Sequence, residues 1–182
     1  NNKENIAKDM EMIKAAGFTD IIVDVRPTTG DVLFNTNVVD QVKRMDVWGN
    51  SGYSYYERTE TWDYLQAFIE EARIQGLKVN ASINTFVGGY LCPYNLGHDG
   101  VLFRDESKKG WASVANLADG LTNTMDLLDD ETDYGAKFFN PANDDVQNFV
   151  LQLLADLAKY DLDGIILDRC RYDDYGLSLI HI

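Results

Sequence analysis

The spacing of apolar residues predicts three amphipathic helices, at residues 3–16, 61–76 and 140–161. In each segment apolar residues recur three or four positions apart, which places them on one face of a helix. Thr61 is suited to cap the second helix, and Gly17 and Gly76 are suited to end the first two. In the third, Asp144 and Asp145 fall near the start, where the helix dipole favours negative charge.

Short β-branched runs separate these helices and predict three buried strands, at residues 18–26, 77–86 and 163–168. Helices and strands therefore alternate, which is typical of a parallel sheet with helices outside. Two architectures remain, an open doubly wound sheet and a closed barrel. None of the three strands is followed by a glycine-rich phosphate-binding turn, which would favour the first.

The polar residues of the strands favour the barrel. Side chains alternate along a strand, so each strand carries a polar residue at its carboxyl end on the face away from the helices: Arg26, Asn84 and Asp168. Asp24 shares that face with Arg26. A second layer of helices would bury these groups at a cost of about 1–3 kcal/mol for each one left unpaired. We therefore predict an α/β fold that is part of a (β/α)₈ TIM barrel.

The connections between elements are strongly unequal in length. Residues 27–60 and 86–139 follow strands and are predicted to be long loops, whereas the returns from helix to strand are tight. In a barrel the active site lies among the loops at the carboxyl ends of the strands. Aromatic residues in these connections are candidate stacking platforms for sugar rings, with packing within the loop as the alternative: Trp48, Tyr53, Tyr55, Tyr56 and Tyr90.

Composition narrows the classes of partner. The 182 residues include 16 basic and 30 acidic ones, and the net charge of −14 argues against nucleic acid as a partner. No apolar run approaches the roughly 20 residues needed to span a bilayer, so no membrane-spanning segment is expected. Two histidines and scattered carboxylates predict no metal site and no cofactor. Cys92 and Cys170 leave a disulfide or two free thiols open.

Three blocks of sequence resemble a known family. They are "GFTDIIVDVRPTTGDVLFNT", "WDYLQAFIEEARIQGLKVNASINTF" and "FFNPANDDVQNFVLQLLADLAKYDLDGIILD". In this order and spacing they are similar to the family-10 glycosylhydrolases, also called DUF187, a barrel group distantly related to the α-amylases. The resemblance implies that the visible strands are numbers two to four of the barrel. It also implies a carbohydrate substrate and a location at the bacterial cell envelope.

The same resemblance sets expectations about the limits of the domain. A partial TIM-barrel catalytic domain is expected over residues 1–177, with the remaining barrel strands outside this sequence. We interpret residues 178–182 as a tail foreign to the domain. The sequence departs from the family pattern after Asp168, where Arg169 replaces the usual second Asp and Arg171 replaces an aromatic residue. This departure indicates an anionic or otherwise unusual sugar.

The resemblance implies that Asp168 occupies the position of the catalytic nucleophile in a glycoside hydrolase. Arg26 and Arg171 are charges that could keep it ionised. The alternative is a buried ion pair between Asp168 and Arg26. Asp24 is expected to contact substrate or to brace Arg26, and Asn84 to bind a sugar hydroxyl or to bond within the barrel.

No residue of the sequence is assigned as the general acid, which the family places on a later strand. The predicted function is hydrolysis of an oligo- or polysaccharide. The alternative is a carbohydrate-binding pseudoenzyme on the same barrel.

Overall fold

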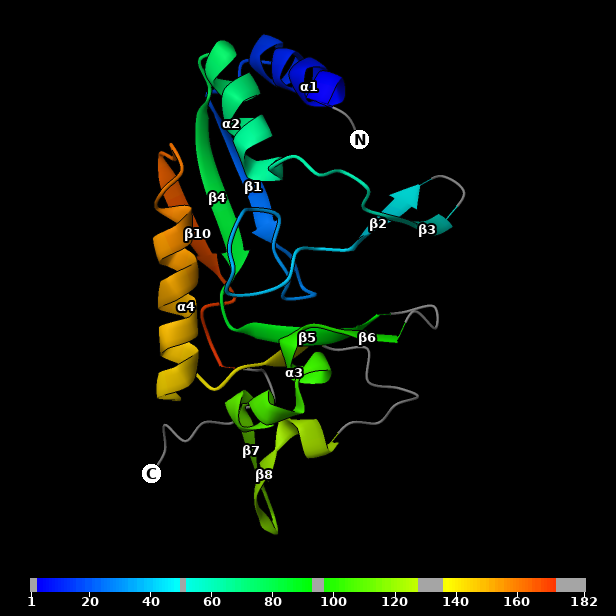
Figure 1. The fold of residues 1–182 in the computed structure, drawn as a ribbon, viewed down its shortest axis with the longest axis vertical. Coiled ribbons are helices and arrows are strands. Elements are labelled where there is room, and N and C mark those ends of the chain that lie inside the picture. The colour runs from blue at the N-terminus through cyan, green and yellow to red at the C-terminus, as the bar shows by residue number, and fades with distance from the viewer. Residues whose placement is uncertain (1–2, 50–51, 93–96, 128–135, 173–182) are drawn as a thin grey trace.

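The computed structural model describes residues 3–49, 52–92, 97–127 and 136–172, and Figure 1 shows their arrangement. The helices are α1 (Lys3–Ala15), α2 (Tyr64–Ile74), α3 (Val101–Arg104) and α4 (Asp144–Leu157), with 3₁₀ helices η1 (Glu106–Trp111) and η2 (Thr124–Leu127). The longer strands are β1 (Asp20–Arg26), β2 (Arg44–Gly49), β3 (Gly52–Glu57), β4 (Lys78–Asn84), β5 (Val87–Cys92) and β10 (Gly164–Asp168). The shorter ones are β6 (Gly97–Asp99), β7 (Val114–Leu117), β8 (Gly120–Asn123) and β9 (Ala136–Phe138).

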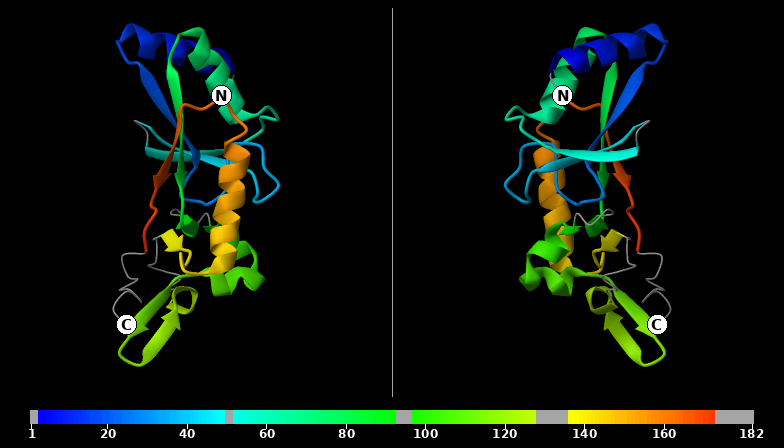
Figure 2. Two further views of the ribbon diagram at one scale, coloured as in Figure 1. Left: turned by 90° about the vertical axis from the view of Figure 1, so that its left-hand side faces the viewer. Right: turned by 90° about the vertical axis from the view of Figure 1, so that its right-hand side faces the viewer.

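A three-stranded parallel sheet in the order β1-β4-β10 forms the centre of the fold. These are the three predicted strands, and the helix-strand alternation is confirmed. Helices α2 and α4 lie on one side of the sheet, and the other side carries none of the described helices (Figure 2). Ile22 of β1 points to that second side and is 64% exposed, whereas its neighbours Ile21 and Val23 are buried.

The apolar core lies between the sheet and its helices. Strand residues such as Val79 and Ala81 pack with the apolar stripe of α4, which includes Val146 and Leu153. The ends of α4 agree with its sequence, because Asn143 caps the first turn and Asp144 and Asp145 follow it. In β1 and β4 the alternating pattern therefore separates a buried face from a more exposed one.

Helix α2 begins later than its sequence suggests. The predicted N-cap was Thr61, but the cap is Asp63, whose carboxylate accepts the backbone N–H of Gln66 at 3.1 Å. The Tyr160 hydroxyl after α4 also donates to the Asp63 carboxylate. Gly17 and Gly76 follow α1 and α2 with φ of 90° and 64°, as expected for glycines that end helices.

The two long connections contain secondary structure, so the prediction of long loops was wrong for much of their length. The first contains the antiparallel hairpin β2–β3, and the second contains the sheet β6-β5-β9, helix α3 and the hairpin β7–β8. Their strands have three to six residues, too few for a clear alternation of apolar and polar positions. The prediction of a closed barrel goes beyond the described sheet and stays a prediction.

An ion-pair cluster joins the two long connections. Arg104 of α3 donates to both carboxylate oxygens of Asp31, a residue only 1% exposed, and to Asp99 at 2.6 Å. Burial raises the pKa of Asp31, while the hydrogen bonds and charge of Arg104 oppose that rise. Asp40 lies 3.8 Å from the same guanidinium. Residues from both connections thus converge on one cation.

Backbone packing beside this cluster is tight around Gly100. Its φ of +104° is a conformation that side chains rarely adopt. A Cβ atom at this position would lie against the Cα of Gly89 and the carbonyl oxygen of Thr29, and 2.8 Å from the carbonyl oxygen of Gly88. All three contacts are to backbone, so no side chain can move aside.

Gly100→Ala is therefore expected to destabilise the chain by about 4 kcal/mol or more, because both strain and overlap oppose the methyl group. Gly52→Ala is the matched control: Gly52 has a φ of +100° but no atom within 4 Å of its would-be Cβ. It should lose about 1–2 kcal/mol from strain alone. Urea unfolding followed by circular dichroism measures both, and equal losses would contradict the predicted overlap.

Candidate functional site

The candidate site lies where the parallel strands end, on the face without helices. The register pairs Asp24 with Ser82, Ser82 with Ile166, and Asn84 with Asp168. Laterally paired residues of a parallel sheet point to the same side. Asp24, Asn84 and Asp168 therefore share one face, as predicted.

Asp168 is the last residue of β10 and is exposed. Its carbonyl oxygen accepts the N–H of Thr85 at 2.8 Å, which fixes the strand end against the end of β4. Its carboxylate accepts the N–H of Arg169 at 2.7 Å. Arg169 has φ of 45° and, apart from glycines, is the one described residue with positive φ. Left-handed backbone of this kind clusters at functional sites.

The pKa of the Asp24 carboxylate also depends on the groups at these strand ends. Desolvation raises its pKa, the N–H of Arg26 lowers it, and the negative charge of Asp168 raises it further. The residue itself is exposed, so only its carboxylate is partly desolvated. The sequence did not identify Arg169 as a site residue, although its positive charge also acts on Asp24.

Arg26 lies on the opposite side of the sheet, and its predicted face was wrong. The register of β1 shifts between Asp24 and Arg26, so that Arg26 pairs with Ile83. Without this β-bulge it would pair with Asn84. Because Ile83 belongs to the buried face, the side chain of Arg26 enters the core and is fully buried.

The contacts of Arg26 are with backbone oxygens and aromatic rings. Its guanidinium donates to the carbonyl oxygens of Asn84 and Val87, the latter at 2.6 Å. Its Cζ lies 5.9 Å and 5.8 Å from the ring centres of Phe139 and Phe149, within the range of cation–π attraction. Burial lowers the pKa of Arg26 to about 10, so it remains charged at neutral pH.

The same contacts concern the alternatives that the sequence left open for Asp168, Asp24 and Asn84. No ion pair between Arg26 and Asp168 occurs among the described residues, so the ion-pair alternative for Asp168 is not the one adopted. Asp24 touches Arg26 through the backbone N–H at 3.3 Å. The Nδ2 of Asn84 donates to the carbonyl oxygen of Arg26 at 2.9 Å, as in the alternative of a bond between strands.

The remaining predicted residues lie after β10, in β5 and in the β2–β3 hairpin. Arg171 has its Cζ 5.5 Å from the ring centre of Phe138 and donates to the carbonyl oxygen of Tyr172. Tyr90 belongs to β5 and pairs with Asp99 of β6. The backbones of the other four candidate aromatic residues lie in the β2–β3 hairpin, but their side chains lie outside the described part: Trp48, Tyr53, Tyr55 and Tyr56.

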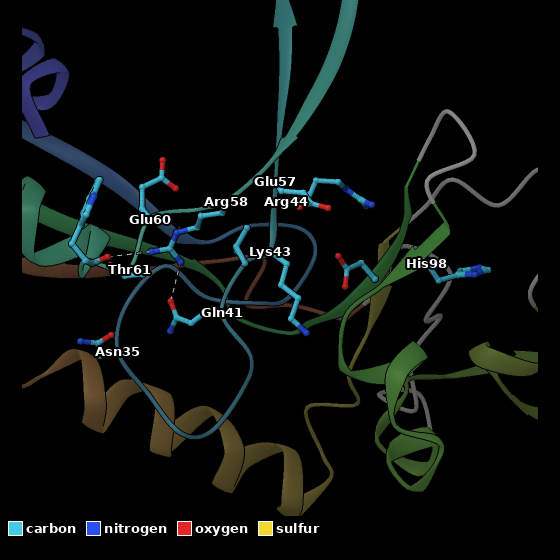
Figure 3. Close-up of a pocket in the computed structure, with 12 residues that line it drawn as sticks. Asn35, Gln41, Lys43, Arg44, Glu57, Arg58, Glu60, Thr61 and His98 are labelled. Atoms are coloured by element: carbon cyan, nitrogen blue, oxygen red, sulfur yellow. Dashed lines mark hydrogen bonds between the residues drawn. The ribbon is translucent and has the colours of Figure 1, made fainter. Parts of the chain in front are cut away.

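A surface hollow of about 930 Å³ lies beside the long connections (Figure 3). Its walls come from the segment before β2, the base of the β2–β3 hairpin, the start of α2 and β6. Polar side chains and Trp62 line it, and Asp24, Asn84 and Asp168 do not. The sequence did not predict this hollow, because Trp62 appeared only as part of the helix start.

The described residues contain no group of three histidine, cysteine or acidic side chains that could hold a metal ion. Within the same ranges no helix is both long and apolar enough to cross a bilayer. Cys170 is an exposed free thiol, and the side chain of Cys92 lies outside the described residues. Residues 178–182 also lie outside them.

Comparison with known proteins finds no family model that matches the chain. Membership of the family-10 glycosylhydrolases therefore remains a prediction. Among curated proteins the chain is similar to an S-layer-related protein from Niallia circulans, with 29% identity over 180 residues, covering 94% of this chain and 10% of that protein. The chain thus spans about a tenth of the length of this relative.

Solved structures give a further comparison. The chain resembles alpha-L-fucosidase isoenzyme 2 from Paenibacillus thiaminolyticus with a TM-score of 0.57 and 20% identity, over 92% of this chain and 20% of that one. It also resembles a hypothetical protein from Ruminiclostridium thermocellum ATCC 27405 with a TM-score of 0.56 and 10% identity, over 95% of this chain and 73% of that one. At these identities the likeness concerns the fold alone. One fold neighbour is therefore a glycoside hydrolase.

The raised pKa of Asp24 predicts a pH-dependent effect of Asp24→Asn. The ionised carboxylate is disfavoured in the folded chain, so its replacement by a neutral amide should raise the melting temperature at pH 7. The gain should shrink as the pH falls and vanish below about pH 4, where Asp24 is protonated in both states. Thermal unfolding between pH 7 and pH 4 measures it.

Asp9→Asn, on an exposed position of α1, is the control for loss of one negative charge. If Asp24→Asn lowers stability at pH 7, or if its gain persists unchanged at pH 4, the desolvation of Asp24 has been misjudged.

Proposed function

We propose that the protein containing this chain hydrolyses glycosidic bonds of an oligo- or polysaccharide, with Asp168 as the attacking carboxylate. The observation that carries the proposal is the position of Asp168, exposed at the end of a parallel strand and on one face with Asp24 and Asn84. A nucleophile has to reach the substrate and remain ionised. An exposed carboxylate at a strand end meets the first requirement.

The backbone after Asp168 supports the same role. The left-handed conformation of Arg169 turns the chain away from the strand direction, and its N–H donates to the Asp168 carboxylate. This hydrogen bond holds the Asp168 side chain against the turn that follows it. Arg169 thus orients Asp168 through the backbone, while its side chain adds positive charge near the site.

The fold neighbour gives independent support for carbohydrate chemistry. The solved structure from Paenibacillus thiaminolyticus is an alpha-L-fucosidase, and this chain shares its fold over 92% of its own length. Fold alone does not fix a reaction, so the proposal rests on Asp168 and uses the neighbour as support. We take the α-L-fucoside linkage as the first substrate to test.

The second carboxyl group of the reaction comes, in this proposal, from outside the described strands. Asp24 lies two strands away from Asp168, which corresponds to about 10 Å between backbones. Retaining glycosidases hold their two carboxyl groups about 5–5.5 Å apart. Asp24 is therefore better suited to contact substrate than to act as the general acid.

The similarity to an S-layer-related protein supports a location at the cell envelope. We propose that the substrate is a glycan met there. The rival proposal is a protein that binds such glycans without cleaving them, and the absence of a retaining pair among the described strand ends favours it.

Asp168→Asn should lower kcat/KM of the full-length protein at least about 1,000-fold, because an amide cannot attack the sugar carbon. The assay measures release of 4-nitrophenol from aryl glycosides, including 4-nitrophenyl α-L-fucoside. Asp20→Asn is the matched control, since Asp20 is an exposed residue at the other end of β1. The kcat/KM of this variant should stay within about twofold of that of the parent protein.

Three outcomes separate the proposals. Loss of turnover with retained glycan binding supports Asp168 as the nucleophile. Undiminished turnover in Asp168→Asn overturns that assignment. A parent protein that binds glycans but cleaves none of them is the carbohydrate-binding protein of the rival proposal.

A further inference from the structure

The hollow of about 930 Å³ beside the β2–β3 hairpin has the size of a ligand site, since such sites usually measure about 300–1,000 Å³. From its lining we infer that it binds a sugar unit of a neutral saccharide, stacked on Trp62 and hydrogen-bonded by Arg58 and Gln41. The inference rests on the proposed carbohydrate function and extends it, because the hollow does not include Asp24, Asn84 or Asp168.

Arg58 provides the first argument. Its Nη1 donates to Oε1 of Gln41 at 3.1 Å, and its Nη2 to the carbonyl oxygen of Trp62 at 3.4 Å. A guanidinium has five N–H donors, so these bonds leave donors for a ligand. Arg58 forms no ion pair among the described residues, although it is half-buried. Figure 3 shows it beside Gln41 within the hollow.

The charges around the hollow favour a neutral ligand over an anionic one. Lys43 is paired with Asp40 at 3.1 Å, and Asp99 is paired with Arg104 at 2.6 Å. The lining thus has three cations, Lys43, Arg44 and Arg58, against three carboxylates, Asp99 and the two glutamates Glu57 and Glu60. An anionic sugar would meet these carboxylates. A sugar with adjacent hydroxyl groups can instead donate to the carboxylates and accept from Arg58.

Trp62 gives the hollow an apolar surface on which a sugar ring can stack. Its ring stacks on Tyr64 with centroids 6.2 Å apart and an interplanar angle of 7°, and Tyr64 packs on Phe68 at 4.9 Å. This row of rings runs into the start of α2 and holds the indole in place. Trp62 is half-buried and lines the hollow. The Nζ of Lys3 lies 6.0 Å from the centre of the Trp62 ring, so a sugar would share the ring with this cation. The apolar body and polar N–H of the indole suit it to the C–H face of a sugar ring.

The other walls are held by hydrogen bonds to the core elements. Gln41 donates to the carbonyl oxygen of Phe34, and the N–H of Asn35 donates to the Tyr160 hydroxyl at 2.8 Å. Tyr160 in turn donates to Asp63, the N-cap of α2. A lining that is already fixed loses little conformational freedom when it binds a ligand.

The test measures binding to the full-length protein carrying Asp168→Asn, which keeps the probe from being consumed. The probes are cello-, xylo-, manno- and chitohexaose, with hexagalacturonate as the anionic comparison, and affinity is measured by calorimetry. At least one neutral probe should bind. Trp62→Ala should weaken its affinity about tenfold, and Trp62→Phe should restore most of it, because a phenyl ring still stacks.

Arg58→Met should also weaken binding of that probe about tenfold, through loss of charged hydrogen bonds. Lys8→Met is the matched control, because Lys8 is an exposed cation on α1 and does not line the hollow. The affinity of this variant for the same probe should equal that of the parent protein. Thermal unfolding checks that each variant is folded, and Arg58→Met keeps the test valid if Trp62→Ala does not fold.

The inference is overturned if no neutral probe binds, if Trp62→Ala binds as tightly as its parent, or if hexagalacturonate binds more tightly than every neutral probe. These failures differ from failure of the proposed function. Binding that depends on Trp62, in a protein that cleaves no glycoside when Asp168 is restored, supports the hollow and refutes hydrolysis. Cleavage of aryl glycosides by a protein that shows no such binding supports hydrolysis and refutes the hollow as a sugar site.

Discussion

The buried guanidinium of Arg26 is the interaction on which the arrangement of the strand ends depends. It joins β1 to the carbonyl oxygens of Asn84 and Val87, and Asn84 returns a hydrogen bond to the carbonyl oxygen of Arg26. A charge removed from water needs such bonds, since burial without them is strongly unfavourable. The ends of β1 and β4 are thereby held together, and β10 adds to them through Thr85 and Asp168.

A second set of interactions holds the two long connections above these ends. Arg104 gathers carboxylates from both connections, and Gly100 allows their backbones to approach closely. Structure in these connections is therefore fixed from both sides, by ion pairs at one point and by backbone contact at another. The hollow with Trp62 and Arg58 lies among elements held in this way, whereas Asp168 lies on the exposed face of the sheet. The hollow therefore depends on the long connections for its shape, whereas Asp168 depends on the sheet for its position.

The sequence predicted the three long helices and the three parallel strands because their periodicity extends over enough residues. It also placed Asp24, Asn84 and Asp168 on one face, because no irregularity interrupts β4 and β10. It failed at Arg26, since the bulge in β1 leaves no mark in an alternating pattern. It failed at the short strands, which are stabilised by contacts between distant segments. The hollow could not be predicted for the same reason, because Arg58, Gln41 and Trp62 meet only after the chain has folded.

The bulge in β1 also affects how this strand end can change during evolution. Side chains of a strand alternate with a period of two, so one inserted residue exchanges the two faces for all residues that follow. In β1 the extra residue at the bulge brings Arg26 into register with Ile83 on the core side. Regular pairing of the same residues would place the guanidinium on the side of Asp168, so an event that regularised the pairing would move this charge from the interior to the open face of the sheet without altering any amino acid type.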